Sequence, residues 1–171
     1  MHGETLLWGT VNPTGKSSED YHGLFLTERD IEYVSENNIL NGLPLLVEHC
    51  GDPIGSIVSC WKAKDGKLDV LASINRDSME GSIATNFLKN NQVLNDFSLG
   101  YSVSIQYSDS KHCYVPDNKR YNEVSLVRKG AQPDCHIHAY SVEEDKDMEK
   151  RVKELMDRAV NNAAWATLLG E

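Results

Sequence analysis

Short runs in which apolar and polar side chains alternate recur along this chain, and they constrain its fold more than any other feature. Alternation with a period of two is typical of β-strands, because successive side chains point to opposite faces. Turn signals such as Asn12-Pro13-Thr14-Gly15, Gly51-Asp52-Pro53 and Asp65-Gly66 separate several runs. The strand candidates cover residues 4–11, 43–49, 54–61, 68–74, 97–107, 121–127 and 137–142. Residues 43–49 are almost continuously apolar, which is typical of a strand buried on both faces.

Helical spacing replaces the alternation in two internal segments. Thr27 can cap a helix over residues 28–37, whose inner face would carry isoleucine and valine. Asp77, with a glutamate three residues later, can cap a second helix in which Ile83, Phe87 and Leu88 fall at helical spacing. Residues 108–119 are polar and are predicted to form a loop.

The composition changes at residue 143, where an acidic opening precedes apolar residues at helical spacing. We expect residues 1–142 to form a β-barrel domain and residues 143–171 to form an amphipathic helix. This helix would pack on the barrel or on a second copy of the chain. A chain of 171 residues suits one compact domain better than two. The predicted fold class is α+β, mainly β, with an antiparallel sheet or barrel surrounded by a few helices.

Charge and hydropathy exclude several classes of partner. The net charge of -9 argues against a nucleic-acid-binding protein, which would normally carry a basic face. No apolar run is long enough to span a membrane, and the first residues lack the pattern of a signal peptide. The 4 cysteines are too few for a disulfide framework, which favours free thiols in a reducing compartment. We therefore expect a soluble protein without a nucleic-acid or membrane partner.

Three polar residues have the chemistry of a nucleophile, a base and an acid. His49 ends an apolar strand, Ser98 begins the strand at 97–107, and Glu123 lies early in an otherwise apolar strand. A serine hydroxyl becomes a nucleophile when a histidine takes its proton and a third group orients that histidine. Spacing alone does not single out this set. The plain alternatives are a strand serine, a histidine that caps a turn, and an outward-facing glutamate.

Four short blocks resemble, in the same order, the capsid maturation proteases. These are the assemblins of herpesviruses and the prohead proteases of tailed phages. The resemblance covers roughly residues 6–138. The blocks are Leu45-Leu46-Val47-Glu48-His49 with Pro53-Ile54-Gly55, Phe97-Ser98-Leu99-Gly100-Tyr101, Glu123-Val124-Ser125-Leu126-Val127, and Gly130-Ala131.

The resemblance implies a serine endopeptidase that cleaves the capsid scaffold protein, and itself, during capsid maturation. His49 matches the base, and Ser98 matches the nucleophile. Glu123 falls where herpesvirus enzymes have a second histidine and where the phage-type motif reads Glu-Val-Ser-Leu-Val. The resemblance also implies a homodimer that works without a cofactor or metal, inside the immature capsid. That capsid would lie in the host nucleus for a herpes-type virus and in the bacterial cytoplasm for a phage.

The chain departs from the herpesvirus pattern after Gly130. Herpesvirus enzymes have two arginines there, the first of which lends its backbone N–H to the oxyanion hole while the second orients a water. This chain has Ala131 and Gln132. Ala131 can still supply a backbone N–H, because that donor does not depend on the side chain. Gln132 can hold a water but brings no positive charge.

Two other functions are compatible with the sequence. The loss of the arginine pair would suit a catalytically silent capsid-assembly or scaffold domain that retains the protease fold. Cysteine and histidine are zinc ligands, so a small zinc-binding module is a further hypothesis. Its candidate ligands are His112, Cys113, Cys135, His136 and His138. These residues lack a Cys-x-x-Cys pair, and we predict no metal site.

Overall fold

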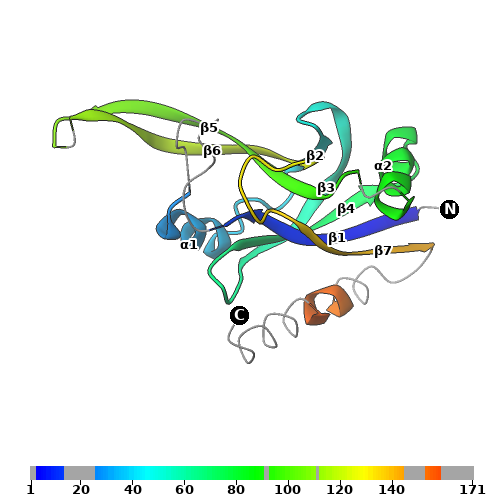
Figure 1. The fold of residues 1–171 in the computed structure, drawn as a ribbon. Helices are drawn as coiled ribbons and strands as arrows, with labels where there is room; N and C mark the ends of the chain where they lie inside the picture. Colours follow the sequence, from blue (N-terminus) through cyan, green and yellow to red (C-terminus); the bar gives the residue numbers. More distant parts are fainter. Residues whose placement is uncertain (1–2, 14–25, 91–92, 111, 145–152, 159–171) are drawn as a thin grey trace.

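A computed structural model of the chain describes residues 3–13, 26–90, 93–110, 112–144 and 153–158 (Figure 1). Strands make up most of this structure, and two labelled helices lie between them. A short helical segment also occupies residues 153–158. The elements in chain order are β1 (Gly3–Asn12), α1 (Glu28–Glu36), β2 (Pro44–Val47), β3 (Cys50–Lys62), β4 (Leu68–Asn75), α2 (Met79–Asn90), β5 (Asp96–Ser108), β6 (Cys113–Val127) and β7 (Ile137–Glu144).

The strands form one curled 7-stranded sheet in the order β5-β6-β2-β3-β4-β1-β7. This arrangement confirms the predicted fold class, which is mainly β with few helices. Two details of the prediction are wrong. The sheet is mixed, because β2 runs parallel to β6. It is also not closed into a barrel: β5 touches the segment before β7 at an isolated bridge between Asp96 and His136. Beyond this bridge β5 and β6 extend outward together, so that β5 leaves β7 (Figure 1).

β5 and β6 extend beyond the rest of the sheet as a two-stranded ribbon (Figure 1). Most of residues 108–119, predicted to be a loop, therefore belong to a hairpin in which Ser108 pairs with Cys113. Tyr107 near the outer end is 54% exposed. A ribbon in solvent needs no apolar face, so residues 113–120 lack the alternation that marks a half-buried strand, whereas the β5 side of the ribbon falls within the predicted strand 97–107.

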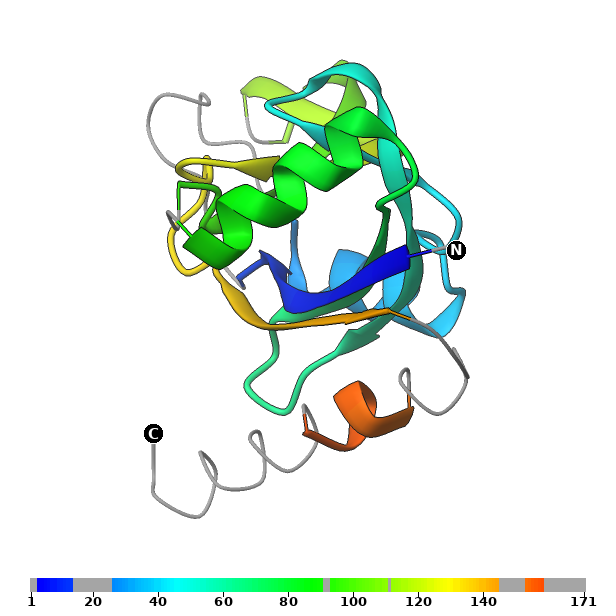
Figure 2. The same cartoon turned by 90° about the vertical axis from the view of Figure 1, so that its right-hand side faces the viewer.

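β1 is buried on both faces of the sheet. Leu7 and Val11 point into the main core, which α1 and α2 help to cover. Leu6 and Trp8 point to the opposite face, where they pack with Leu155 from the helical segment. Figure 2 shows this segment, in orange, outside the curled sheet below β7.

The predicted division at residue 142 falls inside β7, which ends at Glu144. Leu155 is 3% exposed because it packs against the β sheet. Residues 145–152 and 159–171 lie outside the described residues. The twenty-residue terminal helix and the two-part division of the chain therefore stay predictions.

Both labelled helices begin at a side-chain cap. Thr27 caps α1 as predicted: its Oγ1 accepts from the N–H of Asp30 at 3.1 Å, and the Asp30 carboxylate accepts from the N–H of Thr27 at 2.8 Å. In α2 the hydroxyl of Ser78 accepts from the N–H of Gly81 at 3.0 Å. The predicted cap, Asp77, is therefore one residue too early.

The two helices differ in how well their buried faces were predicted. α1 buries Ile31 and Val34, as expected. α2 exposes the predicted Ile83 and Phe87 but buries the predicted Leu88. Its buried residues are Gly81, Ala84, Thr85 and Leu88. Small residues let the helix approach the end of β4 so closely that a Cβ on Gly81 would overlap the carbonyl oxygen of Asn75.

A buried carboxylate lies between β1 and β4. Asp69 is 5% exposed and accepts hydrogen bonds from Trp8 Nε1 at 3.1 Å and from Thr10 Oγ1 at 2.7 Å. His138 Nε2 lies 2.9 Å from the same Thr10 oxygen. Burial raises the pKa of Asp69 to about 6, although the bonds from Thr10 and Trp8 oppose the rise. Burial also lowers the pKa of His138.

The free energy of unfolding should therefore contain a term from Asp69 that falls by about 3 kcal/mol as the pH rises from about 4 to about 6. Folded Asp69 keeps its proton to a higher pH than the unfolded chain does. The folded state is thus favoured at low pH, and the advantage is lost as the pH rises through the folded pKa. Urea unfolding of the wild type and Asp69→Asn at several pH values measures this term.

Asp69→Asn cannot ionise, so the difference between the two proteins isolates the carboxylate. The lowered pKa of His138 acts in the opposite sense, since its charging destabilises the folded state at low pH, but it is common to both proteins. Equal pH dependence in the wild type and the variant would contradict the prediction.

Candidate active site

His49 lies in the tight turn between β2 and β3. Glu48 and His49 have φ angles of 49° and 59°, the two positive values that a two-residue type I′ hairpin needs. Neither is glycine or asparagine, and a left-handed conformation costs other residues on the order of 1–2 kcal/mol each. Two hydrogen bonds from β6 hold the turn: Glu48 N–H donates to Leu126 O at 2.9 Å and His49 N–H donates to Ser125 Oγ at 3.1 Å.

The position of this turn corrects the prediction for residues 43–53. The strand expected to reach His49 ends at Val47, and Val47 pairs with Cys50 across the turn. The Gly51-Asp52-Pro53 segment, predicted to be the turn, belongs to β3. The hydrogen bonds to β6 that stabilise the observed turn are long-range, and a local sequence pattern does not contain them.

The imidazole of His49 connects two groups from different strands. Its Nε2 lies 3.0 Å from Ser98 Oγ on β5, and its Nδ1 lies 2.5 Å from Glu123 Oε1 on β6. A carboxylate accepts hydrogen bonds, so the Nδ1 atom carries the proton and Nε2 is left to accept one from Ser98. This is the tautomer that a histidine needs to act as the base of a serine nucleophile.

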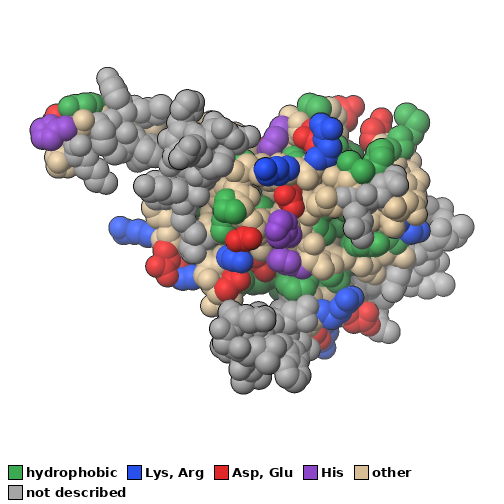
Figure 3. All heavy atoms as spheres, in the orientation of Figure 1, with side chains coloured by type: hydrophobic (Ala, Val, Ile, Leu, Met, Phe, Trp, Pro, Cys, Tyr) green, Lys and Arg blue, Asp and Glu red, His purple; other side chains and the backbone are tan. Residues whose placement is uncertain are grey.

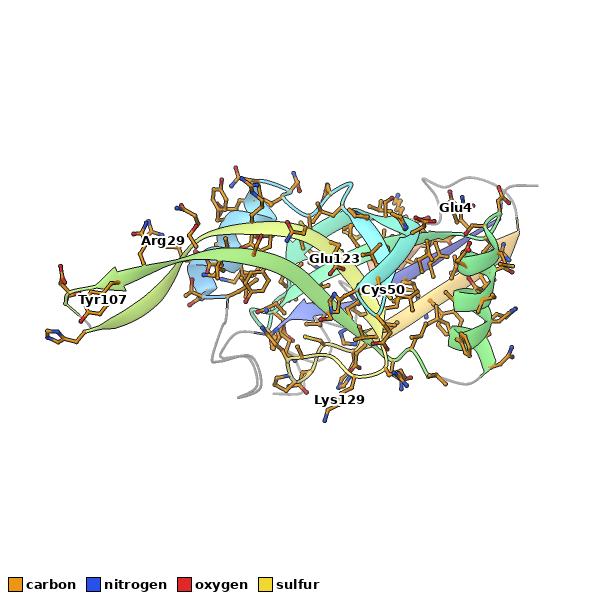
Figure 4. All side chains as sticks on the ribbon, turned by 90° about the horizontal axis from the view of Figure 1, so that it is seen from above. Glu4, Arg29, Cys50, Tyr107, Glu123 and Lys129 are labelled. Atoms are coloured by element: carbon orange, nitrogen blue, oxygen red, sulfur yellow. The ribbon has the colours of Figure 1, made fainter. Side chains whose placement is uncertain are left out.

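The three residues differ in their access to solvent. Ser98 is 7% exposed, and the side chain of Glu123 is 13% exposed. The His49 side chain is 42% exposed, so one edge of the ring faces solvent. Figure 4 labels Glu123 and Cys50, the residue after His49; they lie close together where the β5–β6 ribbon joins the sheet. The structure thus brings together the three residues predicted to form a triad.

Gly100 provides the space in which the Glu123 carboxylate lies. The two residues are directly paired across β5 and β6. A Cβ atom on Gly100 would overlap Oε1 of Glu123, the oxygen that contacts His49. Any side chain at position 100 would therefore displace the Glu123 carboxylate from its observed position.

Gly100→Ala should move the Glu123 carboxylate away from His49 with little effect on folding, because the displaced atoms are the end of a flexible side chain. We expect the reaction of Ser98 with a serine-directed fluorophosphonate to slow by on the order of a hundredfold. The ¹⁵N NMR signals of the His49 ring report the lost contact, and thermal unfolding reports the fold. An unchanged ring spectrum in a folded variant would contradict the prediction.

A cavity of about 220 Å³ lies beside Ser98 and His49. Ala131 and Gln132, the predicted oxyanion-hole residues, both line it. The side chain of Gln132 is held in place, since its Oε1 accepts from Asn12 Nδ2 at 2.7 Å. The full lining is Val11, Asn12, His49, Phe97, Ser98, Leu99, Gly100, Tyr101, Ala131, Gln132 and Cys135. The cavity is thus bounded by β1, β5, the β2–β3 turn and the loop after β6.

Asp96 attaches this loop to the strand that carries Ser98. Its Oδ2 accepts from the N–H of Gly130 at 2.8 Å, and its Oδ1 lies 2.7 Å from His136 Nδ1. A further bond, from Phe97 N–H to Cys135 O at 2.7 Å, joins the same two segments. The N–H of Gly130 is thereby committed to Asp96 and does not donate into the cavity.

Sequence reasoning did not find the supporting residues Asp96, Asn12 and Ser125. Asp96 precedes the Phe97-Ser98 pair and could have been noticed as an acid at the start of a buried strand. Asn12 belongs to a turn signal in the sequence, although the structure leaves it only 1% exposed. Ser125 lay in the matched block without an assigned role. Their roles depend on contacts between segments that are far apart in the sequence.

The candidate zinc ligands do not form a site in the described part of the chain. His112 lies at the turn between β5 and β6, whereas Cys135 and His136 precede β7 and His138 lies in it. No group of three or more His, Cys, Asp or Glu side chains that could hold a metal ion occurs among the residues described.

The surface and the helices give two further observations. On the face shown in Figure 3, acidic and basic side chains are interspersed and no broad area carries a single sign of charge. Within the described ranges, no helix has the length and apolar character needed to cross a lipid bilayer.

The fold resembles that of herpesvirus proteases. A crystal structure of the protease of Kaposi's sarcoma-associated herpesvirus (KSHV), in complex with a hexapeptide phosphonate inhibitor, matches with a TM-score of 0.54 and 16% identity, over 97% of this chain and 75% of that chain. A structure of that protease with a dimer disruptor matches with a TM-score of 0.49 and 14% identity, over 89% and 88% of the two chains. At this identity the likeness is one of fold. Comparison of the sequence with protein-family models and curated proteins gave no match.

Proposed function

We propose that this chain is a serine endopeptidase with Ser98 as nucleophile, His49 as general base and Glu123 as the orienting acid. The observation that carries the proposal is the His49 ring, which contacts Ser98 on one nitrogen and Glu123 on the other. The fold supports the same class, because it resembles a protease that was solved with a hexapeptide phosphonate inhibitor.

In the first half of the reaction, Ser98 Oγ attacks the carbonyl carbon of the scissile peptide bond. His49 Nε2 takes the hydroxyl proton as the C–O bond forms, and Glu123 stabilises the resulting imidazolium through Nδ1. The carbonyl oxygen becomes an oxyanion, to which the N–H of Ala131 donates. When the C–N bond breaks, His49 gives its proton to the leaving amine, and an acyl group remains on Ser98.

In the second half, a water replaces the leaving amine beside His49. The base takes a proton from this water, whose oxygen attacks the acyl carbon. The Ser98 ester bond then breaks, and the proton on His49 returns to Oγ. Gln132 is held by Asn12 at the wall of the cavity, and we propose that it binds a water near the oxyanion. It takes over the water-orienting role of an arginine without supplying a charge.

The substrate that we propose is the capsid scaffold protein, together with the chain itself, inside an immature viral capsid. This part of the proposal depends on the sequence resemblance to the capsid maturation proteases. The host compartment follows from the virus: the nucleus for a herpes-type virus, and the bacterial cytoplasm for a phage.

Labelling with a fluorophosphonate tests the proposed activity without a known substrate. We expect one covalent adduct, which mass spectrometry of the digested protein places on the peptide that contains Ser98. Denatured protein serves as the control, because an isolated serine hydroxyl does not react at a useful rate. A folded wild type that remains unlabelled would favour the alternative, a catalytically silent capsid-assembly domain in which the missing arginines have removed activity.

We also propose that the active form is a homodimer, as in the assemblins that the sequence resembles. Sedimentation velocity over a range of concentrations should show a dimer, and the specific labelling rate of Ser98 should rise with the dimer fraction. A monomer at concentrations where Ser98 is labelled at its full rate would contradict this proposal.

A further inference from the structure

Ser125 touches both partners of the His49–Glu123 pair. Its hydroxyl donates to Glu123 Oε2 at 2.7 Å, and the same oxygen accepts from the backbone N–H of His49 at 3.1 Å. Glu123 Oε1, the other carboxylate oxygen, contacts the His49 ring. Ser125, Glu123 and His49 therefore form a closed ring of hydrogen bonds, in which one oxygen of the carboxylate faces each partner.

The hydroxyl of Ser125 has no alternative partner in solvent, because the residue is 0% exposed. A serine hydroxyl has one proton and can accept through its lone pairs. The proton is used for Glu123, which leaves the lone pairs for the His49 N–H. The Ser125 hydroxyl thus makes one contact through its proton and the other through a lone pair of its oxygen. Removal of this oxygen breaks both contacts.

The two contacts stabilise different features of the site. The bond to Glu123 fixes the rotation of the carboxylate, so that Oε1 points at the imidazole. The bond from His49 N–H holds a residue whose φ of 59° is unfavourable for a side chain with a Cβ. The position of the ring follows from the position of this backbone. A buried serine whose hydroxyl only needed a hydrogen-bond partner could satisfy it with one of these residues. Ser125 instead contacts both His49 and Glu123.

Resting on the proposed function, we infer that Ser125 is a positioning residue, which sets the orientation of the base His49 and of the acid Glu123 through one hydroxyl group. It does not touch the reacting atoms. The residue directly opposite it across β5 and β6 is Ser98 itself. One register position of the sheet therefore carries both the nucleophile and the group that aligns its base.

The test compares three substitutions of Ser125 that separate the hydroxyl from the volume of the side chain. Ser125→Ala removes the oxygen, Ser125→Cys keeps the size but donates poorly, and Ser125→Thr keeps the hydroxyl and adds a methyl group. We expect the rate of Ser98 labelling to fall by on the order of tenfold to a hundredfold in Ser125→Ala and Ser125→Cys. In Ser125→Thr it should stay close to the wild-type rate.

Thr85→Val is the matched control for the loss of a buried hydroxyl. Thr85 lies on α2 and its Oγ1 is 3.0 Å from Thr5 Oγ1, away from the site. This variant should lose stability, as Ser125→Ala does, but keep the wild-type labelling rate. The comparison separates a slower reaction caused by weaker folding from one caused by misplacement of His49.

The ¹⁵N NMR spectrum of the His49 ring provides a readout that needs no activity. In the wild type and Ser125→Thr, we expect the proton on Nδ1 to be protected from exchange with solvent. In Ser125→Ala and Ser125→Cys this proton should exchange faster. If the wild type is never labelled, the proposed function fails, yet the ring spectra still decide the role of Ser125. Wild-type spectra and labelling in Ser125→Ala or Ser125→Cys would overturn the inference.

Discussion

Replacement of Ser98 by alanine is expected to abolish fluorophosphonate labelling and to slow peptide cleavage by on the order of 10⁶-fold. The variant keeps His49 and Glu123 in contact but has no oxygen at the position 3.0 Å from His49 Nε2. Without that atom the acyl intermediate cannot form. Folding should be unaffected, because the side chain removed is small and the histidine ring retains access to solvent.

Ser104→Ala is the matched control for this experiment. Ser104 lies on the same strand as Ser98 and is exposed on the outer ribbon. Its loss should change neither the labelling rate nor the cleavage of the scaffold protein, measured by gel electrophoresis after the two proteins are mixed. If Ser98→Ala processes the scaffold at the wild-type rate, the assignment of the nucleophile is wrong.

Glu123→Gln should produce the second largest effect, a loss of on the order of 10⁴-fold in the reaction rate of Ser98. A glutamine has nearly the same shape but only one acceptor oxygen. That oxygen cannot accept from both the His49 Nδ1–H and the Ser125 hydroxyl, which now use separate carboxylate oxygens. An amide NH₂ facing Nδ1 would favour the tautomer with its proton on Nε2, which cannot act as a base toward Ser98.

The control for this variant comes from the same turn. Glu48 is the residue before His49, and its carboxylate accepts from the backbone N–H of Arg128 at 2.9 Å, outside the His49 pair. Glu48→Gln should therefore retain most of the reaction rate. The NMR tautomer of His49 distinguishes the mechanisms, since only Glu123→Gln should move the proton to Nε2. Equal rates in the two variants would show that the charge of Glu123 has no special role.

Sequence patterns predicted the elements that have one buried and one exposed face, because burial imposes a period on polarity. The buried Ile31 and Val34 on one side of α1 are an example. The β6 side of the outer ribbon, residues 113–120, is not predicted as a strand because neither of its faces has to be apolar, whereas the β5 side lies within the predicted strand 97–107. The predicted apolar stripe of α2 is right for Leu88 and wrong for Ile83 and Phe87. The close approach of the helix to Asn75 requires a glycine at position 81, which a search for large apolar residues does not find.

The candidate site was predictable in its residues and not in its geometry. Ser98, His49 and Glu123 came from a resemblance in short blocks, and the structure brings them within hydrogen-bond distance. The features that hold them there are long-range. The left-handed turn at His49 depends on Ser125, 76 residues away. The space for Glu123 depends on a missing side chain at Gly100, across the strand pair. A local sequence pattern does not predict contacts between residues that are this far apart in the chain.

The parallel pairing of β2 with β6 has a consequence for the order of events during synthesis. Leu45 lies beside Val124, so β6 can dock only after the segment that contains β3, β4, α2 and β5 has left the ribosome and folded back. A nascent chain that ends before β6 already carries His49 and Ser98, but it has neither Glu123 nor the strand that holds the turn in place. The complete set of groups therefore first exists once β6 has been synthesised, and a nascent chain that ends before β6 cannot hold His49 in the orientation that the proposed mechanism needs.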